Sequence, residues 1–353
     1  MQGVGSPCAI PRSRRVCLSQ RIAMSAQGLS DIPCATVPFR RSGRSGLHLP
    51  SLSISLTDRI PGYGDGLSRV RWLEHAMSWG AIHFDISTPY GADMPSIHTE
   101  LGVLRRQHHE LLISTRVGFA THCFRPPEGF ASRKCILSAL EMTLRHTGLD
   151  CVDILFAHRH DPATPLEETM GALASAVQQG KAVYVGLSGY APAPARRALA
   201  LLRDLGVAAV ACQAPYSLVN RWPEDGLFDV LRTAGAGLIA CAPLAHGTLS
   251  GYRTALSPAS EVSDTAYVSL SQIAASRGQT LPQLALSWVL RDSNIASALV
   301  SVSRLPHLNA DCQAAGATNF APEELDLLDV LCPAPPHLPF PCGSRTDEST
   351  PAS

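Results

Sequence analysis

The fold is decided by one stretch of the sequence, SRKCILSALEMTLRHTGLDCVDILFAHRHDPATPLEETMGALASAVQQGKAVYVGLS (residues 132–188). Two of its runs, VDILFAH (152–158) and AVYVGLS (182–188), are rich in β-branched and aromatic residues, which is typical of buried strands. Apolar residues recur at helical spacing before the first run, at Ile136, Leu137, Leu140 and Leu144. Gly148 and Gly180 stand where helices are expected to end. The stretch therefore predicts helix, strand, helix and strand in succession.

The same alternation covers most of the chain. Six further strand-like runs are SLSISL (51–56), AIHFDI (81–86), LLISTRV (111–117), VAAVACQ (207–213), GLIACA (237–242) and ASALVSV (296–302). Eight strands that alternate with helices over roughly 300 residues indicate a (β/α)8 TIM barrel. A doubly wound sheet would need a glycine-rich fingerprint after its first strand, and PGYGDG (61–66) is followed by Leu67 instead of the third glycine. The barrel is therefore the favoured α/β fold.

Composition excludes several classes of function. The 353 residues are 45% hydrophobic and 16% charged, and the formal net charge is +0. A neutral chain without a basic excess is not typical of proteins that bind nucleic acid or anionic membranes. No apolar run approaches the length that spans a bilayer. The 11 cysteines include no C-x-x-C pair, which argues against a disulfide framework or a zinc knuckle.

The two ends of the chain differ from its middle. The first thirty residues contain arginines and serines but no acid, which is the composition of an organellar transit peptide or of an over-extended start before Met24. We favour the second interpretation and expect a cytoplasmic protein. Residues 1–36 are thus predicted to be a disordered or mis-assigned extension, 37–335 the barrel, and 336–353 a disordered tail rich in proline and serine.

Polar residues end several of the apolar runs, where a TIM barrel places its chemistry. They are Asp85, Arg116, His158, Ser188 and Gln213, and Tyr90 follows in the loop after the second run. Taken singly, each has an ordinary structural explanation as a cap, a turn residue or a buried histidine. Together, an acid, a phenol, a cation and an imidazole form a proton-transfer site. A tyrosine can protonate a carbonyl that accepts hydride, if a nearby cation lowers the tyrosine pKa.

A metal site is an alternative interpretation of the same region. His158 and His160 lie two positions apart on one run, and Asp161 follows them. Metallohydrolase barrels use such pairs. No further ligand set stands at suitable strand ends, so we expect no metal.

At this point the sequence resembles a known family, the aldo-keto reductases, from about Phe39 to Leu331. It is closest to the branch that holds bacterial L-glyceraldehyde 3-phosphate reductase and the potassium-channel β-subunits. The most specific likeness is residues 132–188. Four further stretches resemble family motifs: RRSGRSGLHLPSLSISL (40–56), CQAPYSLVNRW (212–222), CAPLAHGTLSG (241–251) and LVSVSRLPHL (299–308). The first resembles the N-terminal hairpin that closes the bottom of the family's barrel.

The resemblance implies an NADPH-dependent reduction of an aldehyde or ketone. The family's catalytic tetrad falls on Asp85, Tyr90, Arg116 and His158. Tyr90 would be the general acid, and His158 would orient the carbonyl. The resemblance also implies these cofactor contacts: Ser188, Gln213, Tyr216, Pro243, Leu244, Gly251, Ser303, Arg304, His307 and Asp311. Arginine at the expected 2′-phosphate position favours NADPH over NADH.

Some positions depart from the family. Its tetrad cation is a lysine, and here it is Arg116; Cys241 stands where this branch has an aromatic that stacks on the nicotinamide. Two hypotheses therefore remain. The protein reduces a small-molecule carbonyl substrate, or it is a catalytically impaired relative that binds nucleotide or a protein partner. The sequence leaves the identity of the substrate open, and it is compatible with a monomer and with a homo-oligomer.

Overall fold

The computed structural model describes residues 37–56, 69–86, 108–118, 129–250, 263–301 and 305–333. The predictions made for residues 1–36 and 336–353 lie outside these ranges. So do four predicted site residues: Tyr90, Gly251, Ser303 and Arg304.

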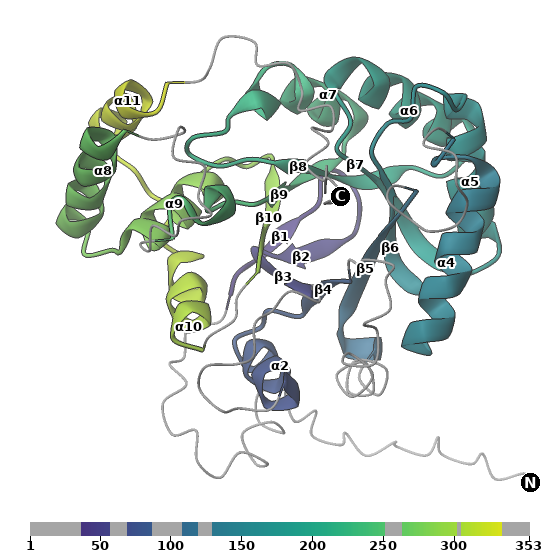
Figure 1. Cartoon of the computed structure of the whole chain (residues 1–353), viewed down its shortest axis with the longest axis horizontal. Coiled ribbons are helices and arrows are strands. Elements are labelled where there is room, and N and C mark those ends of the chain that lie inside the picture. The colour runs from purple at the N-terminus through teal and green to yellow at the C-terminus, as the bar shows by residue number, and fades with distance from the viewer. Residues whose placement is uncertain are drawn as a thin grey trace, which may run out of the picture.

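Within the described ranges, eight parallel strands close into a barrel in the order β10-β3-β4-β5-β6-β7-β8-β9. Their bounds are β3 Leu52–Leu56, β4 His83–Ile86, β5 Leu112–Val117, β6 Val152–His158, β7 Ala182–Ser188, β8 Ala209–Pro215, β9 Gly237–Cys241 and β10 Ile295–Val300. Helices surround the strands, and α4 to α7 form an arc outside them (Figure 1). The (β/α)8 prediction is confirmed.

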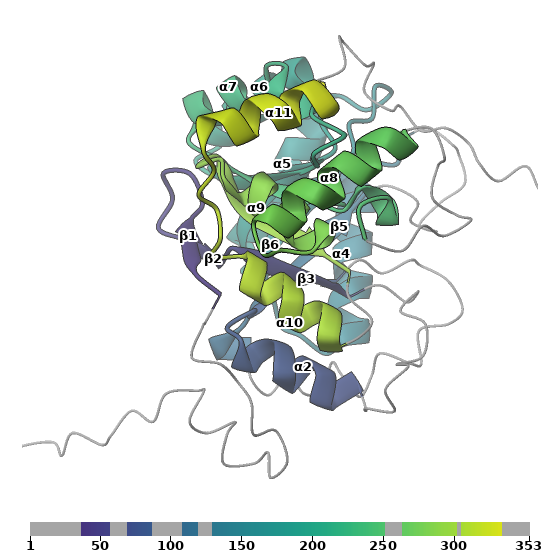
Figure 2. The ribbon, with the colours of Figure 1, turned by 90° about the vertical axis from the view of Figure 1, so that its left-hand side faces the viewer.

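The helices follow the strands as the sequence period predicts. They are α2 Arg69–Ser78, α4 Arg133–Thr147, α5 Leu166–Gln178, α6 Pro192–Asp204, α7 Leu227–Ala234, α8 Asp264–Ser276, α9 Leu281–Leu290, α10 Leu305–Ala314 and α11 Pro322–Leu331. Helix α4 shows the local causes: the Ser132 hydroxyl accepts from the Cys135 amide at its start, and Gly148 adopts a left-handed φ of 66° at its end. Helices α8, α10 and α11 cover another side of the barrel (Figure 2). No helix of the described ranges combines the length and apolar character needed to cross a bilayer.

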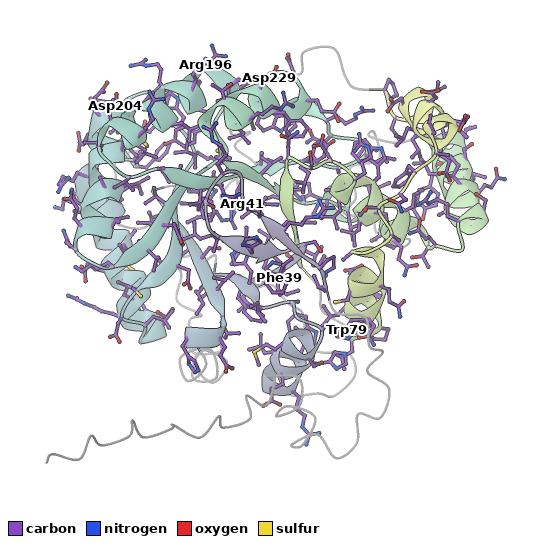
Figure 3. All side chains as sticks on the ribbon, turned by 180° about the vertical axis from the view of Figure 1, so that it is seen from behind. Phe39, Arg41, Trp79, Arg196, Asp204 and Asp229 are labelled. Carbon is purple, nitrogen blue, oxygen red and sulfur yellow. The ribbon has the colours of Figure 1, made fainter. Side chains whose placement is uncertain are left out.

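An antiparallel hairpin, β1 Phe39–Arg41 and β2 His48–Pro50, closes the end of the barrel where the strands begin. From behind, Phe39 and Arg41 lie near the centre of the ring of helices (Figure 3). The hairpin turn contacts the chain before β9 so closely that a Cβ on Gly43 would lie 2.1 Å from the Gly235 carbonyl oxygen. Glycine is required there, because φ at Gly43 is also +57°. The predicted N-terminal hairpin is thus present.

The barrel interior is divided into two sectors. An apolar sector packs the hairpin against side chains of the strands opposite it, among them Ile154, Phe156, Ile239 and Leu299. A polar sector lies on β10, β3, β4 and β5, where the side chains of four residues are fully buried: Ser297, Ser53, His83 and Ser114. Buried polar groups are costly unless hydrogen-bonded, so this second sector needs internal partners.

Candidate active site

The strand ends bring the predicted polar residues to one mouth of the barrel. Parallel pairing places His158 of β6 opposite Ser188 of β7, and Ser188 opposite Gln213 of β8. Asp85 lies one residue before the end of β4, and Arg116 lies one residue before the end of β5. Side chains alternate along each strand, so these residues share the inward face.

Asp85 is the centre of this group and is completely buried. Arg116 Nη2 lies 3.3 Å from its Oδ2. The Ser114 hydroxyl donates to Oδ1 at 2.6 Å, and Gln213 Nε2 donates to the same oxygen at 3.1 Å. Burial by itself raises the pKa of Asp85, but Arg116, these two hydrogen bonds and the nearby His83 together hold it below the usual range. Asp85 is therefore ionised at neutral pH.

His158 is neutral in the same site. Burial and the positive charges of Arg116 and Arg159 lower the pKa of its imidazole, Asp85 opposes them in part, and the resulting pKa is about 3. A neutral imidazole can donate an N–H to a carbonyl oxygen without giving up a proton. The chain turns sharply directly after His158, where Arg159 has a left-handed φ of 71° and its amide donates to the Ser188 carbonyl.

A pocket of about 430 Å³ opens beside this group and is lined by Arg116, Cys241 and the turn after β9. Pro243 and Leu244, two of the predicted cofactor contacts, lie in its wall. Burial raises the pKa of the Cys241 thiol to about 12, although Arg116 opposes the shift. Cys241 is thus a small neutral side chain in the pocket wall and not a reactive thiolate.

Gln213 and Ser188 are both buried at the mouth. The amide nitrogen of Gln213 donates to Asp85, but its Oε1 has no hydrogen-bond partner among the described residues. A buried acceptor without a partner is costly, which makes it a natural contact for a ligand N–H.

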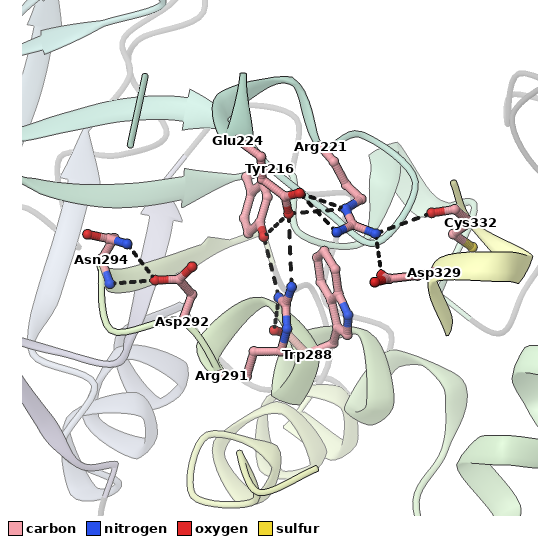
Figure 4. Close-up of polar contacts among 9 residues, drawn as sticks. All are labelled: Tyr216, Arg221, Glu224, Trp288, Arg291, Asp292, Asn294, Asp329 and Cys332. Atoms are coloured by element: carbon pink, nitrogen blue, oxygen red, sulfur yellow. Dashed lines mark hydrogen bonds and ion pairs between the residues drawn. The ribbon is translucent and has the colours of Figure 1, made fainter. Parts of the chain in front are cut away.

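The structure places other predicted cofactor residues away from this pocket's wall. Tyr216 is fully buried, donates its hydroxyl to Glu224 at 2.7 Å and stacks on Trp288 with 5.4 Å between ring centroids (Figure 4). Asp311 is buried within α10, which raises the pKa of its carboxyl to about 7, and His307 lies exposed on the same helix.

Two of the residues considered for a metal site, Asp161 and His160, make contacts that stabilise the local structure. The Asp161 carboxylate accepts from the Ala131 amide, the Ala163 amide and the Thr164 hydroxyl, as a turn residue does. The His160 ring lies 5.7 Å from the Tyr190 ring. In the part of the chain that the structure describes, no group of three or more His, Cys, Asp and Glu side chains could hold a metal ion.

Comparison with known proteins agrees with this geometry. The sequence model described as "Aldo/keto reductase family" matches residues 65–332. The chain belongs to the aldo/keto reductase family. It is 36% identical to L-glyceraldehyde 3-phosphate reductase of Escherichia coli strain K12 over 318 residues, which cover 82% of this chain and 91% of that protein.

This chain is also similar to two other proteins, one in sequence and one in solved structure. A putative voltage-gated potassium channel subunit beta of Schizosaccharomyces pombe is 31% identical over 295 residues, which cover 76% of this chain and 85% of that protein. A thermostable aldo-keto reductase solved in complex with the inhibitor epalrestat superposes with a TM-score of 0.67 at 27% identity, over 83% of this chain and 99% of that one. The predicted family is confirmed.

Sequence reasoning missed two residues of this aldo/keto reductase site. Ser114 donates directly to Asp85, and His83 contacts Ser114 from below. The available signal was the period of two: Ser114 precedes Arg116 by two positions, and His83 precedes Asp85 by two, so each pair shares the inward face.

Proposed function

We propose that this protein reduces an aldehyde or ketone to an alcohol with NADPH as the hydride donor. The observation that carries the proposal is the ionised Asp85 beside Arg116, with neutral His158 at the same barrel mouth. Oxidoreductase chemistry is what the family's reductases share, and a cation held by a buried carboxylate is the means of tuning a proton donor.

Each residue has a role in this reaction. His158 would donate an N–H to the carbonyl oxygen and orient the carbonyl. Tyr90 would give the proton, and Arg116 would lower the tyrosine pKa through its charge. Asp85 would hold Arg116 in place. NADPH, when bound, supplies the hydride.

The residues present fit this cofactor. Gln213 Oε1 has no hydrogen-bond partner among the described residues, so it suits the N–H of a carboxamide, and Ser188 lies beside Gln213 in the strand register. The pocket next to Arg116 adds Pro243 and Leu244 as apolar contacts. Ser303 and Arg304 are the proposed 2′-phosphate contacts, because a guanidinium matches phosphate geometry.

Arg116 replaces the lysine of the family's tetrad, and the replacement has a chemical consequence. Both residues carry one positive charge, but a guanidinium is planar, larger and remains protonated. Its charge is spread over three nitrogens, so the field at a tyrosine oxygen depends on which nitrogen faces it. Arg116 Nη2 is already engaged with Asp85 at 3.3 Å.

A second candidate function is nucleotide or partner binding without efficient turnover. Cys241 favours it, because a small thiol in the pocket wall offers little surface for an aromatic nicotinamide ring. One similar protein is described as a putative potassium channel subunit and not as a reductase.

The test measures NADPH consumption with methylglyoxal and with glyceraldehyde 3-phosphate, for the wild type, Arg116→Lys and Tyr90→Phe. The wild type is expected to turn over, and loss of the general acid in Tyr90→Phe should lower kcat by about 10²–10⁴-fold. NADPH binding is measured in parallel by fluorescence. A folded wild type that binds no NADPH contradicts the reductase function. Binding without turnover, restored by Arg116→Lys, identifies the impaired relative.

A further inference from the structure

A continuous chain of hydrogen bonds runs through the polar sector of the barrel. Ser297 Oγ of β10 lies 2.5 Å from Ser53 Oγ of β3, and Ser53 Oγ lies 2.7 Å from His83 Nδ1 of β4. His83 Nε2 lies 3.0 Å from Ser114 Oγ of β5, which donates to Asp85 at 2.6 Å. All five side chains are completely buried. The chain connects the interior below the site to the carboxylate at the mouth.

Donors and acceptors allow one consistent direction along this chain. Because Ser114 gives its proton to the carboxylate, its oxygen accepts from His83 Nε2–H. The other ring nitrogen, Nδ1, is then unprotonated and accepts from the Ser53 hydroxyl. Ser53 in turn accepts from Ser297. Every O–H and N–H dipole therefore points toward the negative charge of Asp85.

The His83 ring is neutral in this arrangement, as the chain requires. Burial lowers the pKa of its imidazole to about 4, although Asp85 raises it. A protonated ring would carry hydrogens on both nitrogens and would leave Ser53 with no acceptor at Nδ1. Aligned hydrogen bonds in a low-dielectric interior also polarise one another.

We propose that His83 is a positioning residue that acts through Ser114 to keep Asp85 ionised and its Oδ2 directed at Arg116. The effect on turnover rests on the proposed reductase function, but the effect on Asp85 itself does not. Ser114 occupies one oxygen of the carboxylate, so the other remains for the guanidinium.

Other groups also face Asp85 and are part of the account. Among the described residues, those on other strands of the barrel are Arg116 on β5, His158 on β6, Gln213 on β8 and Cys241 on β9. Arg116 and Gln213 stabilise the carboxylate directly. His158 and Cys241 are neutral at pH 7, because burial lowers the first pKa and raises the second. Gln213 donates to the same oxygen as Ser114, so the two hydrogen bonds share the stabilisation of Oδ1.

The experiment follows the protonation of Asp85 in the folded protein without substrate. Difference infrared spectra, with Asp85→Asn as the blank, report the carboxyl band of Asp85 as the pH falls. Ser114→Ala is expected to raise the pKa of Asp85 by about one to two units, because a hydrogen bond to a charged group is lost. His83→Phe should raise it by about one unit. The Gln side chain of His83→Gln can both donate and accept, so in that variant the pKa of Asp85 should stay close to its wild-type value.

The double variant distinguishes positioning from general damage. If His83 acts through Ser114, His83→Phe adds little to the shift already caused by Ser114→Ala, and the two effects are coupled. Ser51→Ala is the matched control, because Ser51 is also fully buried next to β3 but its hydroxyl has no partner among the described residues. It should leave the pKa of Asp85 unchanged.

The outcomes separate this inference from the proposed function. An unchanged pKa of Asp85 in folded His83→Phe overturns the inference, whatever the activity. Should that variant fail to fold, His83→Leu takes its place, because it also removes the donor to Ser114, and an unchanged pKa there has the same meaning. A shifted pKa in a protein that reduces no carbonyl supports the chain and refutes only the reductase function. In an active enzyme, the acid limb of the pH profile of kcat/KM is expected to move to higher pH in Ser114→Ala and in His83→Phe.

Discussion

Replacing Gly186 by alanine tests how tightly the barrel is filled beneath the candidate site. Gly186 lies on β7 directly opposite Phe156 of β6. A Cβ at this position would lie 2.4 and 2.5 Å from two ring carbons of Phe156 and 2.6 Å from the carbonyl oxygen of Ala211. The Phe156 ring is completely buried, and the Ala211 oxygen belongs to the backbone, so neither contact can be relieved by a side chain that swings into solvent.

The expected cost follows from these overlaps. Overpacking a core typically costs about 1–3 kcal/mol, and contact with backbone places Gly186→Ala at about 3 kcal/mol or more. For a barrel of about 300 residues that corresponds to a fall of roughly 5 °C in Tm. The free energy of unfolding is measured by urea titration followed by circular dichroism.

The matched control is Gly171→Ala in α5, where the nearest atom to a new Cβ is Arg133 Nη1 at 3.9 Å. Alanine is a better helix former than glycine, so this variant should gain about 0.5–1 kcal/mol. Adding Phe156→Leu to Gly186→Ala should recover part of the lost stability, because the clash with the ring is removed. The recovery should be incomplete, because the clash with the Ala211 carbonyl oxygen remains. If Gly186→Ala costs less than about 1 kcal/mol, the packing argument is refuted.

Three further predictions follow from charges and from the pocket. Burial raises the pKa of Asp311 in the folded protein to about 7 from 3.8, so the stability of the wild type falls as the pH rises through that window. Asp311→Asn should therefore be more stable than the wild type by about 2–4 kcal/mol at pH 8 and equally stable near pH 4. The Tm of both proteins measured against pH tests this. Arg221→Ala should cost about 2–3 kcal/mol in urea titrations, because the largely buried Arg221 pairs with two carboxylates, whereas the exposed pair of Arg232 should cost under about 0.5 kcal/mol. Cys241→Phe should tighten NADPH binding by about 3–10-fold in fluorescence titrations, and weaker binding would contradict the stacking argument.

Most of the fold could be predicted from the sequence because its two periods are clear. The bounds predicted for β6 and β7 are those observed, and both strands are flanked by well-marked helices. The strand β8 begins two residues later than predicted. Val207 is apolar, but its amide donates to the Leu202 carbonyl and closes the end of α6, a use of a β-branched residue that composition alone does not reveal.

The candidate site could be predicted only in part. Strand ends in a barrel meet at one mouth, so Asp85 and Arg116 were expected together, and they form an ion pair. The contacts of Tyr216 were not foreseeable, because its partners come from different parts of the chain: Glu224 ends a short 3-10 helix after β8, and Arg291 directly follows α9 (Figure 4). The hydrogen bonds of the polar sector were missed because they join side chains on adjacent strands, and which inward residues meet depends on the register between those strands.

The barrel closes between its first and last strands, β3 and β10, and this has a consequence for synthesis of the chain. The contact between Ser53 and Ser297 spans 244 positions. At about 5–20 residues per second, a ribosome needs roughly 10–50 s between the two serines. During that interval β3 exposes an unpaired edge, and β9 exposes another from its own synthesis until β10 is made; such edges are sites for aggregation or for chaperone binding. A nascent chain that stalls before Ile295 therefore has an open sheet and an incomplete support for Asp85, so the site is among the last parts of the molecule to mature.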